Sequence, residues 1–173
     1  AVFSSILSWI NIEERVENTL DNYMMFQETE NHVVGHYFRG LYQILKFIND
    51  CELSEMEKEK YSRLLRAQLS SDELALLYFN CITPSVDSGQ FRSLLIKFKI
   101  LEHLRLGKED FWERFTLSGR SVYTFKCDLV KYVEFNEDGS VQGSAFGNNP
   151  TAMKELHSHN NSSQGTQPSC APA

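Results

Sequence analysis

Residues 70–82 read SSDELALLYFNCI, and this stretch decides how the chain folds. Ser70 followed by Glu73 has the spacing of a capping box, in which each residue's side chain bonds the other's backbone amide. Every position over 74–82 except Asn80 is apolar or aromatic, and a helix that is apolar all round lies inside a protein. The stretch therefore predicts a central buried helix, and a proline shortly after it marks its end.

Further helices are predicted on both sides of this central one. Amphipathic periodicity or a second capping box, at Ser54 and Glu57, predicts helices at 11–28, 32–50, 54–68 and 90–105. We therefore expect a mainly α fold, a compact helical bundle of about five to six helices. Its core is expected over residues 11–115.

The C-terminal third is less regular. Residues 108–115 are expected to form a short helix, and β-branched and aromatic residues predict a small β-hairpin near 121–145. From residue 148 the composition becomes polar, with few apolar side chains, so 148–173 is expected to be a disordered tail. The expected organisation is one helical domain over 1–147 followed by this tail.

Composition narrows the classes of protein that the chain can represent. Its 173 residues are 42% hydrophobic, enough for a core without disulfides or metal. The net charge of −6 does not indicate nucleic-acid binding. The four cysteines lack a C-x-x-C pair and are expected to be reduced thiols of a cytoplasmic protein. The apolar N-terminal segment is too short to span a bilayer and is a poor signal peptide.

Common catalytic motifs for phosphate binding, dinucleotide binding, zinc proteases and serine hydrolases do not occur in the sequence. Polar residues among core-forming ones instead make up a candidate functional cluster: His36, Arg39, Tyr42, Arg66, Gln68, Glu73 and Asn80. One interpretation is structural, with these groups hydrogen-bonding one another and helix ends. The other is a polar pocket between helices, in which Arg39 and Arg66 suit an anion or phosphate.

No metal site or cofactor is predicted. His157, His159 and Cys170 are ligand types, but they do not form a four-ligand constellation with supporting groups. No catalytic residue is assigned, and the chain is not expected to be an enzyme.

Three segments carry a resemblance to a known family: GHYFRGLYQILKFI at 35–48, YSRLLRAQLSSDEL at 61–74 and LYFN at 77–80. Together they resemble the phage abortive infection (AbiC-like) family of bacterial proteins, over roughly residues 31–104. The resemblance implies an antiphage role in which infection triggers dormancy or death of the host cell. It implies no catalytic residues. Members often carry membrane-spanning helices ahead of the matching region, so we expect this chain to be cut from a longer one.

Three hypotheses follow for the function. The first is a defence module that senses or binds a phage or host component and acts through a protein partner or a membrane segment outside this chain. The second is a nucleic-acid-targeting, RNase-like helical toxin, although the R-x-x-x-x-H motif is absent, since Ile44 follows Arg39 and Ser71 follows Arg66 at that spacing. The third is a regulatory interaction domain with no defence role. The expected location is the cytoplasm, or the cytoplasmic face of the inner membrane if membrane helices precede this chain.

Overall fold

The structure is a computed structural model that describes residues 2–10, 19–82, 87–108, 114–119 and 122–160. It is mostly helical, with two small antiparallel sheets. The helices are α1 (Val2–Ile10), α2 (Thr19–Asp50), α3 (Glu55–Arg66), α4 (Ser71–Ile82), α5 (Gln90–Lys97), the 3₁₀ helix η2 (Ile100–His103), α6 (Lys126–Val130) and α7 (Pro150–Asn160). The strands are β1 (Leu106–Lys108), β2 (Arg114–Leu117), β3 (Val122–Phe125), β4 (Val133–Phe135) and β5 (Val141–Ser144).

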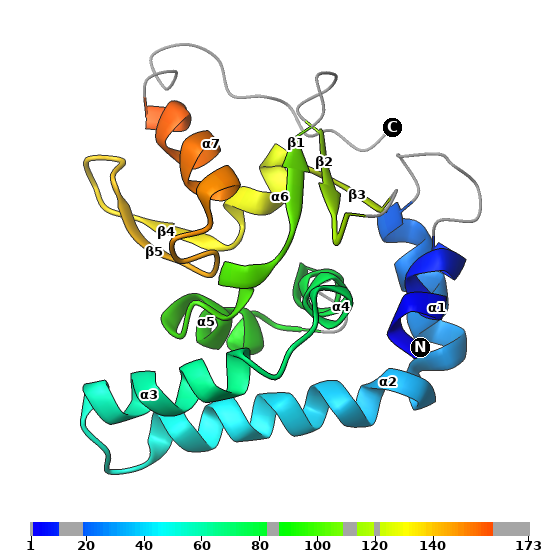
Figure 1. The fold of residues 1–173 in the computed structure, drawn as a ribbon, viewed down its shortest axis with the longest axis horizontal. Coiled ribbons are helices and arrows are strands. Elements are labelled where there is room, and N and C mark those ends of the chain that lie inside the picture. Colours follow the sequence, from blue (N-terminus) through cyan, green and yellow to red (C-terminus); the bar gives the residue numbers. More distant parts are fainter. Residues whose placement is uncertain (1, 11–18, 83–86, 109–113, 120–121, 161–173) are drawn as a thin grey trace.

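Helix α4 is the centre of the molecule, as its sequence predicts. In Figure 1 it is seen end-on, with α2 on one side, the β1–β3 sheet on the other, and α1 and α5 at its flanks. Every residue from Leu74 to Ile82 is buried. The capping box is present: the Ser70 amide donates to Glu73 Oε2 at 2.7 Å, and the Glu73 amide donates to Ser70 Oγ at 3.3 Å.

Helix α2 joins two of the predicted helices into one bent element. The backbone at Glu30 leaves the helical region, with φ −123° and ψ 17°. A long arm after this bend runs beneath the molecule, while the first turns rise beside α1 (Figure 1). The helix predicted over 11–28 is thus observed from Thr19, and residues 11–18 lie outside the described part of the chain.

The helix predicted over 90–105 is interrupted. Asp87 lies before α5 and stabilises its first turn by accepting from the Phe91 amide at 3.1 Å and the Arg92 amide at 3.0 Å. The helix ends at Lys97, and Lys99 then adopts a left-handed backbone with φ 54° and ψ 41°. The chain continues as the short helix η2 and not as a further turn of α5.

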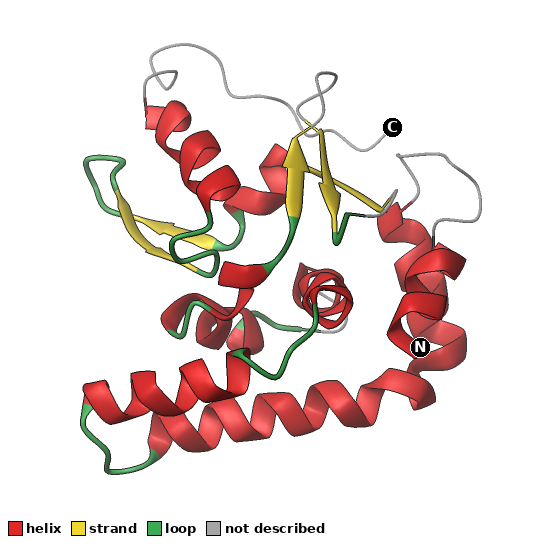
Figure 2. Ribbon diagram, viewed as in Figure 1, coloured by secondary structure: helices red, strands yellow, loops and turns green. Residues whose placement is uncertain are grey.

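Strands replace the short helix that was predicted over 108–115, so that prediction was wrong for the described residues. Lys108 ends β1 and Arg114 begins β2, and β2 lies between β1 and β3 in a three-stranded sheet (Figure 2). Phe115 and Leu117 alternate with half-buried neighbours, which is the period of a strand with one buried face. The register places Gly107 opposite Thr116, and a Cβ at Gly107 would lie 2.5 Å from Thr116 Oγ1.

The predicted hairpin is present within its expected range. Strands β4 and β5 pair antiparallel, and the Asn136 amide donates to Ser140 O at 2.8 Å across the turn between them. The fold is therefore a helical bundle that carries two small sheets on the side of α4 away from the long arm of α2 (Figure 2).

The start of the expected disordered tail is ordered. Residues Pro150–Asn160 form α7, in which Ala152 and Leu156 are 1% and 2% exposed. Spaced four apart, they lie on one face of the helix, and the buried Glu155 pairs with Lys108 at 2.9 Å. Residues 161–173, the rest of that predicted tail, lie outside the described residues.

The cysteines differ in their chemical state. Cys51 and Cys81 are free thiols, but Cys127 is disulfide-bonded, which corrects the expectation that all cysteines are reduced. Burial raises the pKa of the Cys81 thiol well above its ordinary value, so this thiol stays protonated.

Within the described segments, no helix combines the length and the apolar character that crossing a bilayer requires.

Candidate functional site

The structure distributes the seven predicted site residues over several places. His36 and Arg39 are exposed on α2, where Arg39 Nη2 donates to His36 Nδ1 at 3.2 Å. The Tyr42 hydroxyl donates to Gln90 at the start of α5, at 3.0 Å, and Gln68 is exposed after α3. Among the seven, all of which are described, only His36 and Arg39 are hydrogen-bonded to each other. The single polar pocket that was hypothesised is therefore not formed by these residues together.

Asn80 belongs to a buried hydrogen-bond network. Its Oδ1 accepts from the Tyr23 hydroxyl and from Gln27 Nε2, both at 3.3 Å, and Gln27 also donates to the Tyr23 hydroxyl. Burial raises the pKa of Tyr23, so its hydroxyl remains a neutral donor. The network joins the first turns of α2 to the end of α4. These bonds favour the interpretation that Asn80 has a structural role.

Glu73 likewise has structural partners. Besides its capping bonds with Ser70, it accepts from the Tyr37 hydroxyl at 2.8 Å, which ties α4 to the long arm of α2. Partial burial raises the pKa of Glu73, but the hydrogen bonds from Ser70 and Tyr37 outweigh it, so the pKa lies below the ordinary value of 4.5.

A pH-dependent contribution to stability follows from this carboxylate. A carboxyl whose pKa is lower in the folded chain stabilises the fold above its unfolded pKa, and this stabilisation is lost as the pH falls through the folded pKa. We expect Glu73→Gln to lower the melting temperature at neutral pH. The difference from the wild type should shrink as the pH falls from about 6 to about 3, because a protonated Glu73 resembles glutamine. A difference that stays constant across these thermal melts would contradict this role.

Arg66, another of the predicted site residues, lines a pocket. Its guanidinium pairs with Glu102 Oε2 at 2.5 Å and donates to the Lys99 carbonyl at 2.9 Å, and the two side chains of the pair are 10% and 15% exposed. Glu102 Oε1 accepts from the Asn148 amide at 3.1 Å. One buried ion pair therefore connects the end of α3 to η2 and to the loop before α7.

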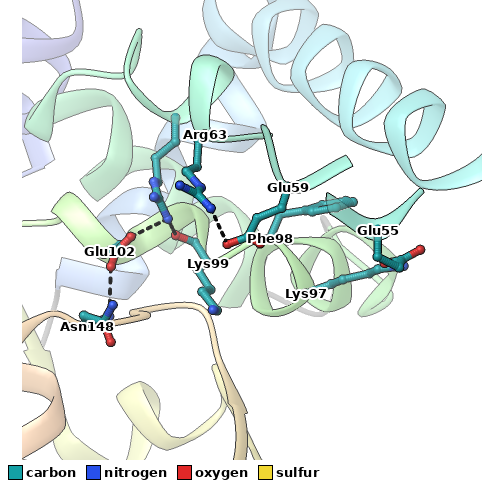
Figure 3. Close-up of a pocket in the computed structure, with 9 residues that line it drawn as sticks. Glu55, Glu59, Arg63, Lys97, Phe98, Lys99, Glu102 and Asn148 are labelled. Carbon is teal, nitrogen blue, oxygen red and sulfur yellow. Dashed lines mark hydrogen bonds and ion pairs between the residues drawn. The ribbon is translucent and has the colours of Figure 1, made fainter. Parts of the chain in front are cut away.

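The pocket around this pair has a volume of about 440 Å³ and is strongly charged. Figure 3 shows Arg63, Lys99, Glu102 and Asn148 at one end and Glu55 beside Lys97 at the other. Its lining residues are Glu55, Glu59, Arg63, Arg66, Lys97, Phe98, Lys99, Glu102 and Asn148. They come from α3, from the junction of α5 with η2, and from the loop before α7.

Ion pairs account for most of the charge in the pocket. Arg63 pairs with Glu59 at 3.0 Å, Lys97 pairs with Glu55 at 3.5 Å, and Arg66 pairs with Glu102. These pairs leave the Lys99 ammonium, which has no ion-pair partner among the described residues. The pocket lining therefore carries one positive charge in excess, although the whole chain is acidic.

The conformation of Lys99 is itself unfavourable. A left-handed backbone brings Cβ too close to the following carbonyl, which costs an L-residue about 1–2 kcal/mol. Lys99 occupies the position just past the C-cap of α5, where glycine is the usual residue. The chain has a lysine at this position in spite of this cost.

Sequence reasoning identified Arg66 but missed the rest of the pocket. Lys97, Lys99 and Glu102 fall in a stretch whose periodicity predicts an uninterrupted helix, and Asn148 falls in the predicted tail. Arg63 and Arg66 in the last turn of α3 were the available signal, since cations are favourable at a helix C-terminus. Their partners could be found only from the tertiary structure.

Within the described ranges, no three His, Cys, Asp or Glu side chains lie close enough together to hold a metal ion. The side chains of His157 and His159, and all of Cys170, lie outside those ranges. The ammonium, guanidinium and amide groups of the pocket suit an anion, and its three carboxylates, Glu55, Glu59 and Glu102, are each paired with a cation.

These features define a class: a mainly helical domain with a buried central helix, two small sheets and a charged pocket at the end of α3. Residues 28–109 match the family model described as putative phage abortive infection protein, so this segment of the chain is similar to that family. The match confirms the resemblance seen in the sequence. No curated protein and no solved structure matches the chain.

Proposed function

We propose that the chain is the folded module of a bacterial antiphage defence protein. It binds a phage or host component during infection and thereby provokes growth arrest or death of the host cell. The observation that carries this proposal is the family match over residues 28–109. The matched segment contains the long arm of α2 together with α3, α4, α5 and η2, so it includes the central helix and most of the pocket lining.

The long arm of α2 supports a function through binding. His36, Arg39, Gln43 and Lys46 are exposed along it, spaced three or four residues apart, so they share one face. The same arm exposes Ile44 and Phe47, which are 48% and 73% exposed. An exposed helix that presents both apolar and cationic side chains suits a protein partner, whose helix or groove covers the apolar groups. We place the module in the bacterial cytoplasm.

Arg39 is the residue whose substitution tests this proposal. Arg39 is exposed, and its side chain is hydrogen-bonded to His36, so Arg39→Lys should fold normally. Arg66 is less suitable for this test because it belongs to a buried ion pair. Lysine keeps the charge but not the bidentate fork. Losing a charged hydrogen bond of about 1.5–3 kcal/mol should weaken partner binding about tenfold to a hundredfold. In a plaque assay with an expressing bacterial host, we expect Arg39→Lys to lose most of the protection at wild-type abundance.

Lys60→Gln is the matched control, because Lys60 is exposed on α3 and lies outside both the Arg39 face and the pocket. It should protect as well as the wild type. Full protection by Arg39→Lys would show that Arg39 does not contribute to partner binding. A wild-type chain that gives no protection against any phage tested, at normal abundance, would contradict the defence function itself.

A further inference from the structure

Lys99 is the charged residue of the pocket whose presence the fold does not explain. Arg63, Arg66 and Lys97 each face a carboxylate and lie in the last turn of α3 or α5, where cations stabilise the helix C-terminus. Lys99 lies past the end of α5, is exposed, and has no ion-pair partner among the described residues. The excess positive charge of the pocket is therefore located at Lys99.

The backbone provides a second, independent observation. Lys99 donates its amide to the Ile96 carbonyl at 3.2 Å, and its left-handed conformation completes the end of α5. Glycine adopts this conformation without a penalty, whereas lysine does not. Unfavourable conformations that persist in a fold cluster at ligand sites, where the side chain has a use that offsets the strain. Lys99 therefore combines a strained backbone with an ammonium group that has no ion-pair partner among the described residues.

We infer that this pocket binds the phosphate group of a small phosphorylated molecule, with Lys99 Nζ as the principal cation. Arg63 and Asn148 line the same end of the pocket (Figure 3), and the guanidinium and the side-chain amide are chemical groups that can donate further N–H hydrogen bonds to an anion there. These donors come from three separate elements. Donors that converge from several directions suit the tetrahedral oxygens of phosphate better than the two coplanar oxygens of a carboxylate.

The size and lining of the pocket indicate what carries the phosphate. A volume of about 440 Å³ exceeds the space of a phosphate alone and lies within the range of small-molecule pockets, about 300–1,000 Å³. Charged residues make up most of the lining, which favours a polar molecule of mononucleotide size over an apolar one. This binding is measured on the purified chain, so it stands or falls independently of the defence function.

Isothermal titration calorimetry on the full chain tests the inference with three probes: inorganic phosphate, adenosine 5′-monophosphate and adenosine. We expect both phosphates to bind and adenosine not to bind. Equal affinities would assign the site to the phosphate group alone, and tighter binding of the nucleotide would assign it to a phosphorylated small molecule. The affinities should fall as salt is added, because the contacts are ionic. No binding of either phosphate up to about 10 mM, weaker than any specific site expected here, would overturn the inference.

Variants of Lys99 separate binding from folding. Lys99→Gly should melt at or above the temperature of the wild type, because it relieves the left-handed strain, yet bind phosphate at least about tenfold more weakly. Lys99→Gln should bind as weakly while keeping a side chain of similar length, and the control Lys60→Gln should bind normally. Unchanged affinity in both Lys99 variants would overturn the inference. A lower melting temperature in Lys99→Gly would then assign Lys99 to the C-terminus of α5 instead.

Discussion

Replacing Leu77 with alanine is expected to lower the free energy of unfolding by about 2–5 kcal/mol. Leu77 is 1% exposed on α4, the helix that all other layers of the molecule surround. The substitution removes buried methyl groups and leaves a cavity that well-packed neighbours fill only in part. Denaturant unfolding of the full chain, followed by circular dichroism, measures the change.

Leu64→Ala is the matched control for this prediction. Leu64 is 58% exposed on α3, so the same chemical change should alter the free energy of unfolding by no more than about 0.5 kcal/mol. A loss below about 1 kcal/mol for Leu77→Ala would mean that α4 is not the centre of the core.

The buried ion pair gives the second large expected effect. We expect Arg66→Ala to lower the free energy of unfolding by about 2–4 kcal/mol, slightly less than for a fully buried pair. The substitution leaves the Glu102 carboxylate without its cation and the Lys99 carbonyl without its donor, in a site where both partners are largely buried. Thermal and denaturant unfolding measure this loss.

Two comparisons test the cause of the loss. Arg63 is one turn earlier on α3 and pairs with Glu59, but the two side chains are 62% and 52% exposed, so Arg63→Ala should cost less than about 1 kcal/mol. The double variant Arg66→Ala/Glu102→Ala should cost less than the two single changes added together. Additive losses would show that Arg66 stabilises the fold through packing and not through Glu102.

The parts of the fold that were predictable are those set by neighbours in the sequence. Ser54 with Glu57, and Ser70 with Glu73, show their capping role at a spacing of three residues. The buried helix α4 is evident because nearly all of its positions are apolar. In these cases the local signal and the tertiary environment agree.

The parts that were missed depend on contacts between distant residues. Residues 106–108 and 114–117 form strands because their backbones pair with each other, and the second of them also pairs with β3; these short segments carry too little periodicity to show it. The break at Lys99 has no glycine or proline to signal it. For the site, Arg66 could be recognised as an unusual cation, but Glu102 and Asn148 are 36 and 82 positions away. No spacing rule brings them together.

The bonds between Glu102 and the loop before α7 also tie the segment matched by the family to the residues that follow it. Asn149 Nδ2 donates to the carbonyls of Glu102 and Leu104, at 3.1 Å and 2.8 Å, and the Asn148 amide donates to the Glu102 carboxylate. A fragment that stopped at residue 109, where the family match stops, would lose these three hydrogen bonds. The family match thus covers less of the chain than these bonds hold together: the later residues act as a clasp, and we expect a shortened or fused version of the module to be more stable when it keeps them through α7.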